Sequence, residues 1–321
     1  MYYLVIDSGT TNSRVRLYEN HNYIDSVKHS VGAKDVAVRG GDNSELVRSL
    51  RELIHEILTK KDLSLDQIEA ILAVGMITSN MGLINIPHQN APVGISDVNL
   101  KEVLFYELTD KPILFVPGVR TGKDLDVDVM RGEETEILGY LSEASVSCEA
   151  LFVHYGSHHK CITVTENKIT NCKTSITGEL MMSIYETTIL KSSLQPLEQL
   201  EPNLEWVKEG YRKYQEAGLG NALFNIRTLD TVNNIHKNKT TSFLLGILIG
   251  IDVELITNSL SSKTKEIILY GKQLFPALSQ EIFQELVPNL SIYVIPEEES
   301  DLLSAKGAIN IYQYSLKEGR M

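Results

Sequence analysis

Residues 4–20 read LVIDSGTTNSRVRLYEN, and residues 151–167 read LFVHYGSHHKCITVTEN. The two stretches align without a gap at an offset of 147 residues, with identity at four of seventeen positions, so a chance match is the alternative explanation. In both, an apolar strand leads into a polar glycine turn, an alternating strand and a Glu-Asn turn. Each copy begins its own half of the chain. We therefore predict two duplicated α/β domains.

The rest of the chain supports this domain organisation. An apolar strand pattern over residues 70–74 ends at Gly75, and another over residues 267–270 ends at Gly271. Polar or glycine turns at strand ends are where α/β domains bind their ligands. We expect a first domain over residues 1–130 and a second over residues 131–321, facing each other across a cleft.

Hydrophobic periodicity predicts the helices of the second domain. A polar helix over residues 197–216 is expected to face solvent, and an apolar helix over residues 243–256 is expected to be buried. The last helix, over residues 302–314, is expected to pack back on the first domain.

Composition excludes several classes of protein. The 321 residues carry a net charge of −12, which disfavours a general nucleic-acid binder because phosphate backbones are repelled. The apolar run over residues 243–253 contains an Asp and is shorter than the roughly 20 residues of a membrane span. The start of the chain lacks the pattern of a signal peptide. Three cysteines without CxxC spacing favour reduced thiols in a cytoplasmic protein.

The first glycine turn has the residues of a phosphate-binding loop. Gly9 permits close backbone approach, and Thr10, Thr11 and Asn12 add hydrogen-bond donors. Asp7, at the end of the preceding strand, suits Mg²⁺, which prefers one or two carboxylates together with phosphate oxygens. The alternative is that these residues only make a stable hairpin turn.

The second turn has a different chemistry. Gly156, Ser157, His158 and Lys160 offer neutral or cationic donors, and His154 stands where the first copy has its carboxylate. If both turns face one cleft, they could hold the β- and γ-phosphates of a nucleotide with one metal ion. A metal cluster of the histidines is the alternative, but their spacing matches no common tetrahedral site.

An acidic helix start lies between the two copies. Gly132 precedes Glu133 and Glu134, which places both carboxylates at the positive end of a helix dipole. An ionised carboxylate there can accept the proton of a substrate hydroxyl during attack on phosphorus. The alternative is an ordinary amphipathic helix with an acidic first turn.

Six segments in this order resemble the 2-dehydro-3-deoxygalactonokinase family, sugar-acid kinases of the actin, sugar kinase and Hsp70 superfamily. The similarity extends from about residue 3 to residue 312, and MRGEET is its most specific segment. The matching segments are DSGTTN at 7–12, GMITSNMG at 75–82, MRGEET at 130–135, GSHHK at 156–160, TGEL at 177–180 and LGILIG at 245–250.

The resemblance implies a fold of two ribonuclease-H-like domains around a nucleotide cleft. It also implies transfer of the γ-phosphoryl group of ATP to the 6-hydroxyl of 2-dehydro-3-deoxy-D-galactonate. By the same resemblance, Glu133 is the expected base and Glu134 the second choice. The other implied roles are Mg²⁺ positioning by Asp7, phosphate binding by both glycine turns, substrate binding by Ser79, Asn80 and Arg131, with Arg131 on the carboxylate, and approach of Gly271 to adenosine.

One departure from the family leaves other functions open. The second turn usually reads Pro-Gly-Thr-His-Cys-Lys, whereas residues 155–160 read YGSHHK here. A nucleotide-gated binding or regulatory protein of the same fold is therefore an alternative, as is a kinase for a different sugar acid or sugar. The expected partners are ATP and a small sugar acid, without nucleic acid or membrane, and a homodimer stays open.

Overall fold

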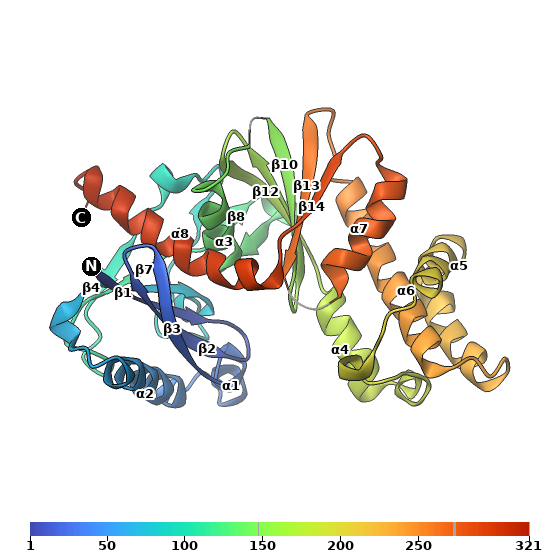
Figure 1. The fold of residues 1–321 in the computed structure, drawn as a ribbon, viewed down its shortest axis with the longest axis horizontal. Helices are drawn as coiled ribbons and strands as arrows, with labels where there is room; N and C mark the ends of the chain where they lie inside the picture. Colours follow the sequence, from blue (N-terminus) through green and yellow to red (C-terminus); the bar gives the residue numbers. More distant parts are fainter. Residues whose placement is uncertain (147, 272–273, 321) are drawn as a thin grey trace. The chain divides into compact units, whose positions relative to one another are not determined.

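The computed structural model describes residues 1–146, 148–271 and 274–320 of a mixed α/β chain (Figure 1). The chain divides into two compact units. The first consists of Met1–Ser147, Thr165–Cys172 and Glu298–Met321, and the second of Cys148–Val164 and Lys173–Glu297. The predicted domain boundary after residue 130 stays a prediction.

A six-stranded sheet forms the centre of the first unit. Its strand order is β3-β2-β1-β4-β7-β6, in which β1 is antiparallel to β2 and parallel to β4. The bounds of these strands are β1 Tyr2–Ser8, β2 Ser13–Glu19, β3 Asn22–His29, β4 Ile68–Gly75, β6 Lys101–Val103 and β7 Ile113–Phe115.

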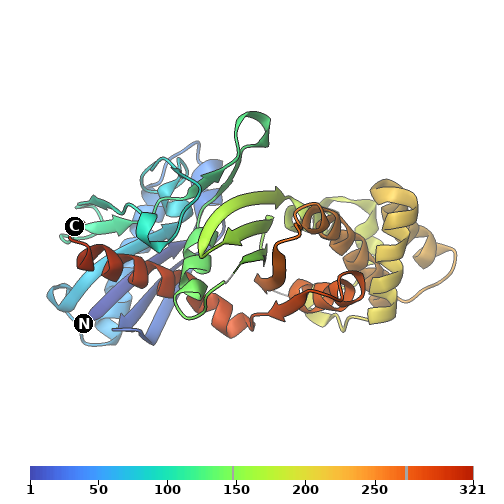
Figure 2. The same cartoon turned by 90° about the horizontal axis from the view of Figure 1, so that it is seen from above.

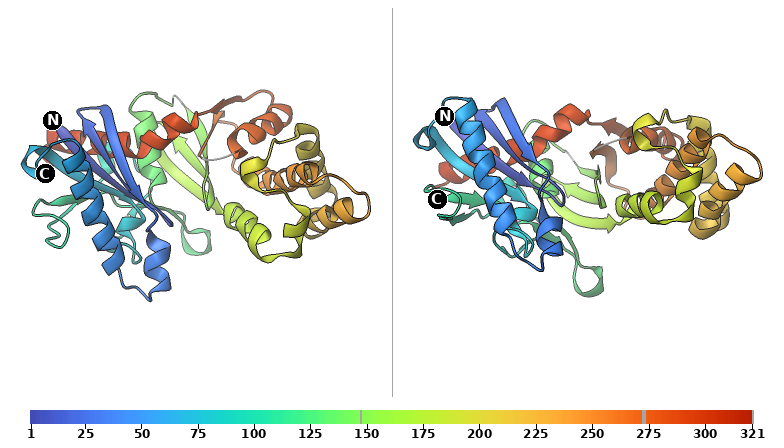
Figure 3. Two further views of the ribbon diagram at one scale, coloured as in Figure 1. Left: turned by 60° about the horizontal axis from the view of Figure 1, so that its bottom comes forward. Right: turned by 90° about the horizontal axis from the view of Figure 1, so that it is seen from below.

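Two long helices explain why β1 is apolar along its whole length. Leu4 and Ile6 point into a core that also contains residues of α2 (Ser44–Lys60), which lies along the sheet (Figure 3). Tyr3 points to the opposite face, where its ring meets that of Tyr312 in α8 (Glu297–Lys317) edge-on at 5.9 Å. Because side chains alternate along a strand, Asp7 shares the α8 face with Tyr3.

Shorter elements complete the first unit. A three-stranded sheet has the order β5-β8-β9, and α3 follows it directly. A Cβ atom at Gly139 of α3 would lie 2.2 Å from a carbonyl oxygen of α8, so the two helices cross with their backbones in contact. The bounds are α1 Ala33–Val38, β5 Gln89–Asn90, β8 Val119–Thr121, β9 Asp128–Met130 and α3 Glu133–Leu141.

A five-stranded sheet has the order β12-β11-β10-β13-β14, with β10, β13 and β14 parallel, and these three strands belong to the second unit. Its strands are β10 Glu149–Tyr155, β11 His159–Thr165, β12 Lys168–Ser175, β13 Thr264–Gly271 and β14 Ser291–Val294. The helices of this part are α4 Thr177–Thr187, α5 Leu204–Thr231, α6 Lys237–Thr257 and α7 Phe275–Leu286. Single 3₁₀ turns are η1 Leu65–Gln67, η2 Met76–Thr78, η3 Ile95–Asp97, η4 Asp124–Asp126, η5 Ile189–Ser193 and η6 Leu197–Gln199.

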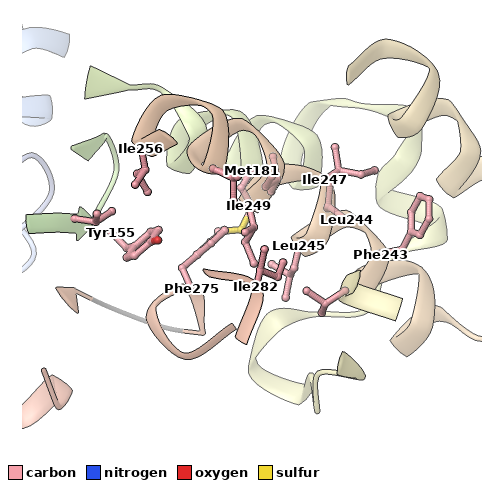
Figure 4. Packing of buried hydrophobic residues seen from close by; sticks show 14 of the residues in the cluster. Tyr155, Met181, Phe243, Leu244, Leu245, Ile247, Ile249, Ile256, Phe275 and Ile282 are labelled. Atoms are coloured by element: carbon pink, nitrogen blue, oxygen red, sulfur yellow. The ribbon is translucent and has the colours of Figure 1, made fainter. Parts of the chain in front are cut away.

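The core of the second unit is built around α6. This helix is long and apolar enough to cross a membrane by length and composition, but most of it is buried inside the protein. Its apolar side chains meet those of β10, α4 and α7, including Tyr155, Met181 and Phe275 (Figure 4). The prediction of a buried helix over residues 243–256 is confirmed.

The predicted polar helix over residues 197–216 was wrong in its bounds and its exposure. The chain forms η6 at Leu197–Gln199, and the helix α5 then extends over Leu204–Thr231. It lies beside α6 (Figure 2), and Val207 and Ala222 are fully buried. A Cβ atom at Gly246 of α6 would lie 1.9 Å from the Val207 carbonyl oxygen. The small apolar residues scattered among charges therefore form a packing face.

The structure confirms the predicted duplication. Ser8 at the end of β1 is paired with Gly75 of β4, and Tyr155 at the end of β10 is paired with Gly271 of β13. Both glycines have positive φ angles, +83° and +120°. The gap-free alignment holds for the first strand of each copy only. The second turn is one residue shorter than the first, because β11 begins at His159.

Candidate active site

The carboxylate of Asp7 lies at the end of β1 and is held by two side chains. Arg16 Nη1 donates to Asp7 Oδ2 at 2.9 Å, and Ser304 Oγ of α8 donates to the same oxygen at 3.1 Å. The arginine side chain is only 4% exposed, whereas that of Asp7 is 31% exposed. Asp7 Oδ1 has no hydrogen-bond partner within the described part of the chain. The group is therefore fixed in place with one oxygen available.

The first glycine turn is closed by its own backbone. Gly9 N–H donates to the carbonyl oxygen of Asn12 at 2.9 Å, so this amide is not directed at a ligand. The carbonyls of Gly9 and Thr10 accept hydrogen bonds from the start of α1. Among the described residues, the amides of Thr10, Thr11 and Asn12 donate to no protein group. These three amides are the available anion donors of the turn.

Two glycines bring the end of β4 and the start of α3 up to this carboxylate. A Cβ atom at Gly75 would lie 2.7 Å from the Ser8 carbonyl oxygen and 3.5 Å from Asp7 Oδ1. Gly132 has a φ of +114°, and a Cβ atom there would lie 3.5 Å from the Cα of Gly75. The strand that carries the predicted metal ligand and the helix that carries the predicted base therefore adjoin within the first unit.

The two glutamates at the start of α3 have different environments. Glu133 is half-buried, and its Oε2 accepts a hydrogen bond from Arg131 N at 3.0 Å. Glu134 is 1% exposed, and both of its oxygens accept from Gly132 N, at 3.0 and 2.8 Å. Burial, and then the charge of Glu133, raise the pKa of Glu134 to about 7. Of the two, Glu133 has the more accessible carboxylate.

Arg131 holds the turn that follows β4. Its Nη1 donates to the backbone oxygen and the hydroxyl of Thr78, at 2.7 and 2.6 Å. Its Nη2 donates to the Ile86 carbonyl at 2.8 Å and lies 3.4 Å from His88 Nδ1. Burial lowers the pKa of the guanidinium, while the Glu134 charge acts in the opposite direction. A bidentate contact between the two Nη atoms and a substrate carboxylate would require some of these bonds to break.

The other two predicted substrate residues lie in the same turn. Ser79 is buried, and its hydroxyl donates to the Met76 carbonyl at 2.7 Å. Asn80 is exposed. The structure thus places Ser79 and Asn80 in the turn that Arg131 contacts through Thr78, and of the three residues Asn80 is the exposed one.

In the second unit, the glycine turn packs against the start of α4. A Cβ atom at Gly178 would lie 2.3 Å from the Gly156 carbonyl oxygen and 2.6 Å from that of Ser157. Glu179 N donates to the Ser157 carbonyl at 2.9 Å, and Glu179 Oε1 lies 3.3 Å from His158 Nε2. The turn is therefore backed by a helix whose first residues follow its backbone closely.

The last two predicted nucleotide residues lie close to this turn in the sequence or in the sheet. Lys160 is 8% exposed, and its Nζ donates to Thr174 Oγ1 at 3.0 Å. A Cβ atom at Gly271 would lie 2.4 Å from the carbonyl oxygen of Tyr155. The alternative of a histidine metal cluster finds no support, because no group of three or more His, Cys, Asp or Glu in the described residues could hold a metal ion.

Sequence reasoning missed three residues that support these sites. Arg16 and Ser304 hold the Asp7 carboxylate, and Asp252 of α6 bonds to residues beside the second turn. Asp252 had a signal, since it is a single acid inside an apolar run. Ser304 had none, because its contact with Asp7 joins residues 297 positions apart.

Comparison with known proteins decides the family. Residues 7–294 match the model of the 2-keto-3-deoxy-galactonokinase family. The chain belongs to this family. It is thus a sugar-kinase-type phosphotransferase, as predicted.

Individual relatives agree with this assignment. The 2-dehydro-3-deoxygalactonokinase of Escherichia coli (strain K12) is 25% identical over 291 residues, which are 88% of this chain and 90% of that protein. A relative from Rhizobium meliloti (strain 1021) with the same assigned activity is 22% identical over 259 residues, 78% of this chain and 79% of that protein.

A solved structure shows the fold. A protein from Sinorhizobium meliloti, assigned as a 2-dehydro-3-deoxygalactonokinase, has a TM-score of 0.76 and 18% identity, covering 99% of this chain and 100% of that one. This similarity and the matching strand orders of the two larger sheets confirm the predicted fold of two duplicated ribonuclease-H-like domains.

Proposed function

We propose that this protein transfers the γ-phosphoryl group of ATP to the 6-hydroxyl of 2-dehydro-3-deoxy-D-galactonate. The observation that carries the proposal is the convergence of Asp7, Gly75 and Gly132 in the first unit, which brings the start of the helix that carries Glu133 close to the strand end that carries Asp7. Membership of the kinase family supplies the reaction class. In this proposal, both glycine turns bind ATP and hold the phosphate groups of the same nucleotide.

Glu133 acts as the base in this proposal. Its carboxylate accepts the proton of the 6-hydroxyl while that oxygen forms a bond to the γ-phosphorus, and the bond to the β-phosphate oxygen breaks to release ADP. The hydrogen bond from Arg131 N orients the Glu133 carboxylate. Glu134 is too buried to touch a substrate, so its role in the proposal is to hold the Gly132 amide.

The residues present fit Mg²⁺ bound mainly by phosphate and water. Asp7 offers Oδ1, while Oδ2 is held by Arg16 and Ser304. Mg²⁺ commonly takes one or two carboxylates and completes its octahedron with water and phosphate oxygens. When bound, the ion would neutralise charge on the phosphates. Asp7 is the residue that would position it, directly or through water.

The substrate carboxylate needs a cation, and two residues are candidates. Arg131 was predicted from the sequence, but its Nη atoms already bind Thr78 and Ile86. Lys34 lines an open hollow beside Thr11 and is exposed. We keep Arg131 as the proposal and treat Lys34 as the alternative that the kinetic test below distinguishes.

The decisive experiment is an acceptor panel. Purified protein, ATP and Mg²⁺ are incubated with several 2-keto-3-deoxy sugar acids and neutral sugars, ADP is followed, and the phosphorylated carbon is assigned by NMR. We expect phosphorylation at the 6-hydroxyl of 2-dehydro-3-deoxy-D-galactonate. A different preferred acceptor would replace the substrate, and ATP binding without any phosphorylation would favour the nucleotide-gated binding protein.

A variant tests the base. Glu133→Gln should lower kcat by at least about a hundredfold, the usual scale for a lost general base, and leave the affinity for ATP within about twofold. Glu143→Gln, an exposed acid on the surface beside Lys306, is the matched control and should retain full turnover. Unchanged turnover in Glu133→Gln would exclude this residue as the base.

Cellular location and assembly are separate proposals. Cys148, Cys161 and Cys172 are free thiols, which supports a reducing, cytoplasmic setting. The homodimer stays a prediction that sedimentation of the purified protein would test.

A further inference from the structure

Asp252 is a buried acid that the proposed reaction does not use. It lies on α6, is 1% exposed, and is surrounded in the sequence by the apolar residues of that helix. Its Oδ2 lies 2.7 Å from His159 Nδ1, and its Oδ1 accepts a hydrogen bond from Thr177 Oγ1 at 2.9 Å. A second hydroxyl, Ser175 Oγ, lies 2.5 Å from Thr177 Oγ1. The carboxylate therefore joins three structural elements.

Both partners of Asp252 are next to the second glycine turn. His159 is the first residue of β11 and directly follows the turn, while Thr177 is the first residue of α4. The residue after Thr177 is Gly178, whose close contact with the Gly156 and Ser157 carbonyls sets α4 against the turn. One carboxylate thus connects the strand that leaves the turn to the helix that backs it.

Aromatic rings fix the imidazole of this network. The His159 ring meets the Tyr155 ring edge-on at 5.0 Å and the Phe275 ring at 4.9 Å. Tyr155 and Phe275 themselves stack at 5.8 Å with an interplanar angle of 10°, as their neighbouring positions in Figure 4 illustrate. The imidazole therefore has little freedom to rotate, and its Nδ1 stays directed at Asp252.

Stability alone does not account for an acid at this position. Burying a carboxylate costs free energy that its hydrogen bonds only partly offset, and an apolar residue of similar size is often as stable or more so. The neighbouring positions of α6 are occupied by such apolar residues. What the acid adds is a fixed geometry for His159 and Thr177, and hence for the turn between β10 and β11 that α4 backs.

We propose that Asp252 is a positioning residue that fixes the second glycine turn, Gly156–His158, in the conformation that binds the phosphate groups of the nucleotide. It acts through His159 and Thr177 and touches no substrate. The inference rests on the proposed function in one respect, namely the role of this turn in binding phosphate.

The test compares three variants within the second unit. Asp252→Leu removes the acid at similar volume, Asp252→Asn keeps one hydrogen-bonding oxygen, and Thr177→Val removes one hydroxyl with little change in shape. Ser242→Ala is the matched control, because Ser242 is also fully buried on α6 and also bonds to another segment, accepting from Asn203 N at 2.9 Å. All four proteins are assayed for kcat, both KM values, binding of Mg²⁺·AMP-PNP by calorimetry, and Tm.

A positioning role predicts a selective loss of nucleotide affinity. Asp252→Leu should raise the KM for ATP and the Kd for AMP-PNP at least about tenfold, the scale of one lost hydrogen bond to a charged group. Asp252→Asn should raise the KM for ATP and the Kd for AMP-PNP less than Asp252→Leu does. Thr177→Val should raise them least and lie nearest to the wild type. The KM for the sugar acid should stay within about twofold in all of them. Ser242→Ala should lower Tm and leave both KM values unchanged.

Other outcomes would overturn the inference. If AMP-PNP affinity is unchanged in both Asp252→Leu and Thr177→Val, or if both KM values rise together in proportion to the loss of Tm, the network is only structural. Should Asp252→Leu fail to fold, Thr177→Val and Asp252→Asn still decide the question. If the wild type phosphorylates no sugar acid, the proposed function fails, but the calorimetric comparison still tests the role of Asp252.

Discussion

Replacement of Glu134 by glutamine should stabilise the folded protein at high pH but not at low pH. Burial first, and then the charge of Glu133, raise the pKa of Glu134 from 4.5 to about 7 in the folded protein. Between these two pH values the folded state keeps the proton that the unfolded state has released. The free energy of unfolding therefore falls as the pH rises from about 4.5, and becomes constant above about pH 7.

The magnitude follows from the pKa change. At about 1.4 kcal/mol per pH unit, ionisation of this carboxyl costs the folded state about 3 kcal/mol at pH 8. Glutamine cannot ionise, and its amide oxygen can still accept a hydrogen bond from Gly132 N or from the Thr135 hydroxyl. Loss of the second acceptor costs about 1 kcal/mol at every pH. Glu134→Gln should thus be about 1 kcal/mol less stable than the wild type at pH 4.5 and about 2 kcal/mol more stable at pH 8.

The assay is urea unfolding of the wild type and the variant between pH 4.5 and 8. Circular dichroism is the appropriate probe, because the single tryptophan, Trp206, lies in α5 of the second unit and would not report on α3. Glu143→Gln, with its carboxylate on the surface, is the control and should follow the pH trend of the wild type. A difference between Glu134→Gln and the wild type that stays constant across this range would refute the assignment of a buried, ionising acid.

Three further predictions concern single positions. Gly271→Ala should lower the free energy of unfolding by more than about 2 kcal/mol, since φ is +120° and a Cβ atom would lie 2.4 Å from the Tyr155 carbonyl. The control is Gly220→Ala, at a helical position with open space, which should raise the free energy of unfolding by up to about 1 kcal/mol in the same denaturation assay. Arg131→Lys should lower the free energy of unfolding by about 1–3 kcal/mol, because its hydrogen bonds to Thr78 and Ile86 are lost. If the KM for the sugar acid rises in Lys34→Met but not in Arg131→Lys, Lys34 is the ligand of the substrate carboxylate. Gly307→Ala should destabilise the α3–α8 crossing, because its Cβ atom would lie 1.9 Å from the Thr135 carbonyl, and calorimetric unfolding that matches the wild type would contradict the crossing.

The sequence predicted those strands whose burial follows from the pattern of apolar residues within the strand itself. The strands β1 and β10 were identified from continuous apolar runs, because burial on both faces leaves that mark directly in the sequence. The bounds of α5 were missed for the opposite reason. Its buried residues are small and widely spaced, so a helix that packs against α6 resembles one that faces solvent.

The candidate site divides along the same line. Asp7 and Glu133 were proposed as candidates because they flank glycines at the end of a strand and the start of a helix, and the family resemblance then favoured Glu133 over Glu134. The state of each side chain depends on distant residues and could not be predicted. The difference between Glu133 and Glu134 is set by burial, and the contact between Asp7 and Ser304 requires the chain to return through α8.

The two glycine turns share one backbone arrangement but carry side chains of different chemistry. In both copies the last residue of the first strand faces a glycine of positive φ on the adjacent parallel strand, so the backbone around each turn is built in the same way. The first copy then adds charge within the sheet itself, where Arg16 of β2 neutralises Asp7 of β1.

The second copy carries His154 at the position equivalent to Asp7, and its buried charge comes instead from Asp252 of a helix behind the sheet. A turn that must present a carboxylate to a cation needs that carboxylate held at its edge. A turn that must present amides to an anion needs its backbone held, which a buried acid behind it can do without lending its own charge to the surface. The different placement of the two acids follows from the different ligands proposed for the two turns.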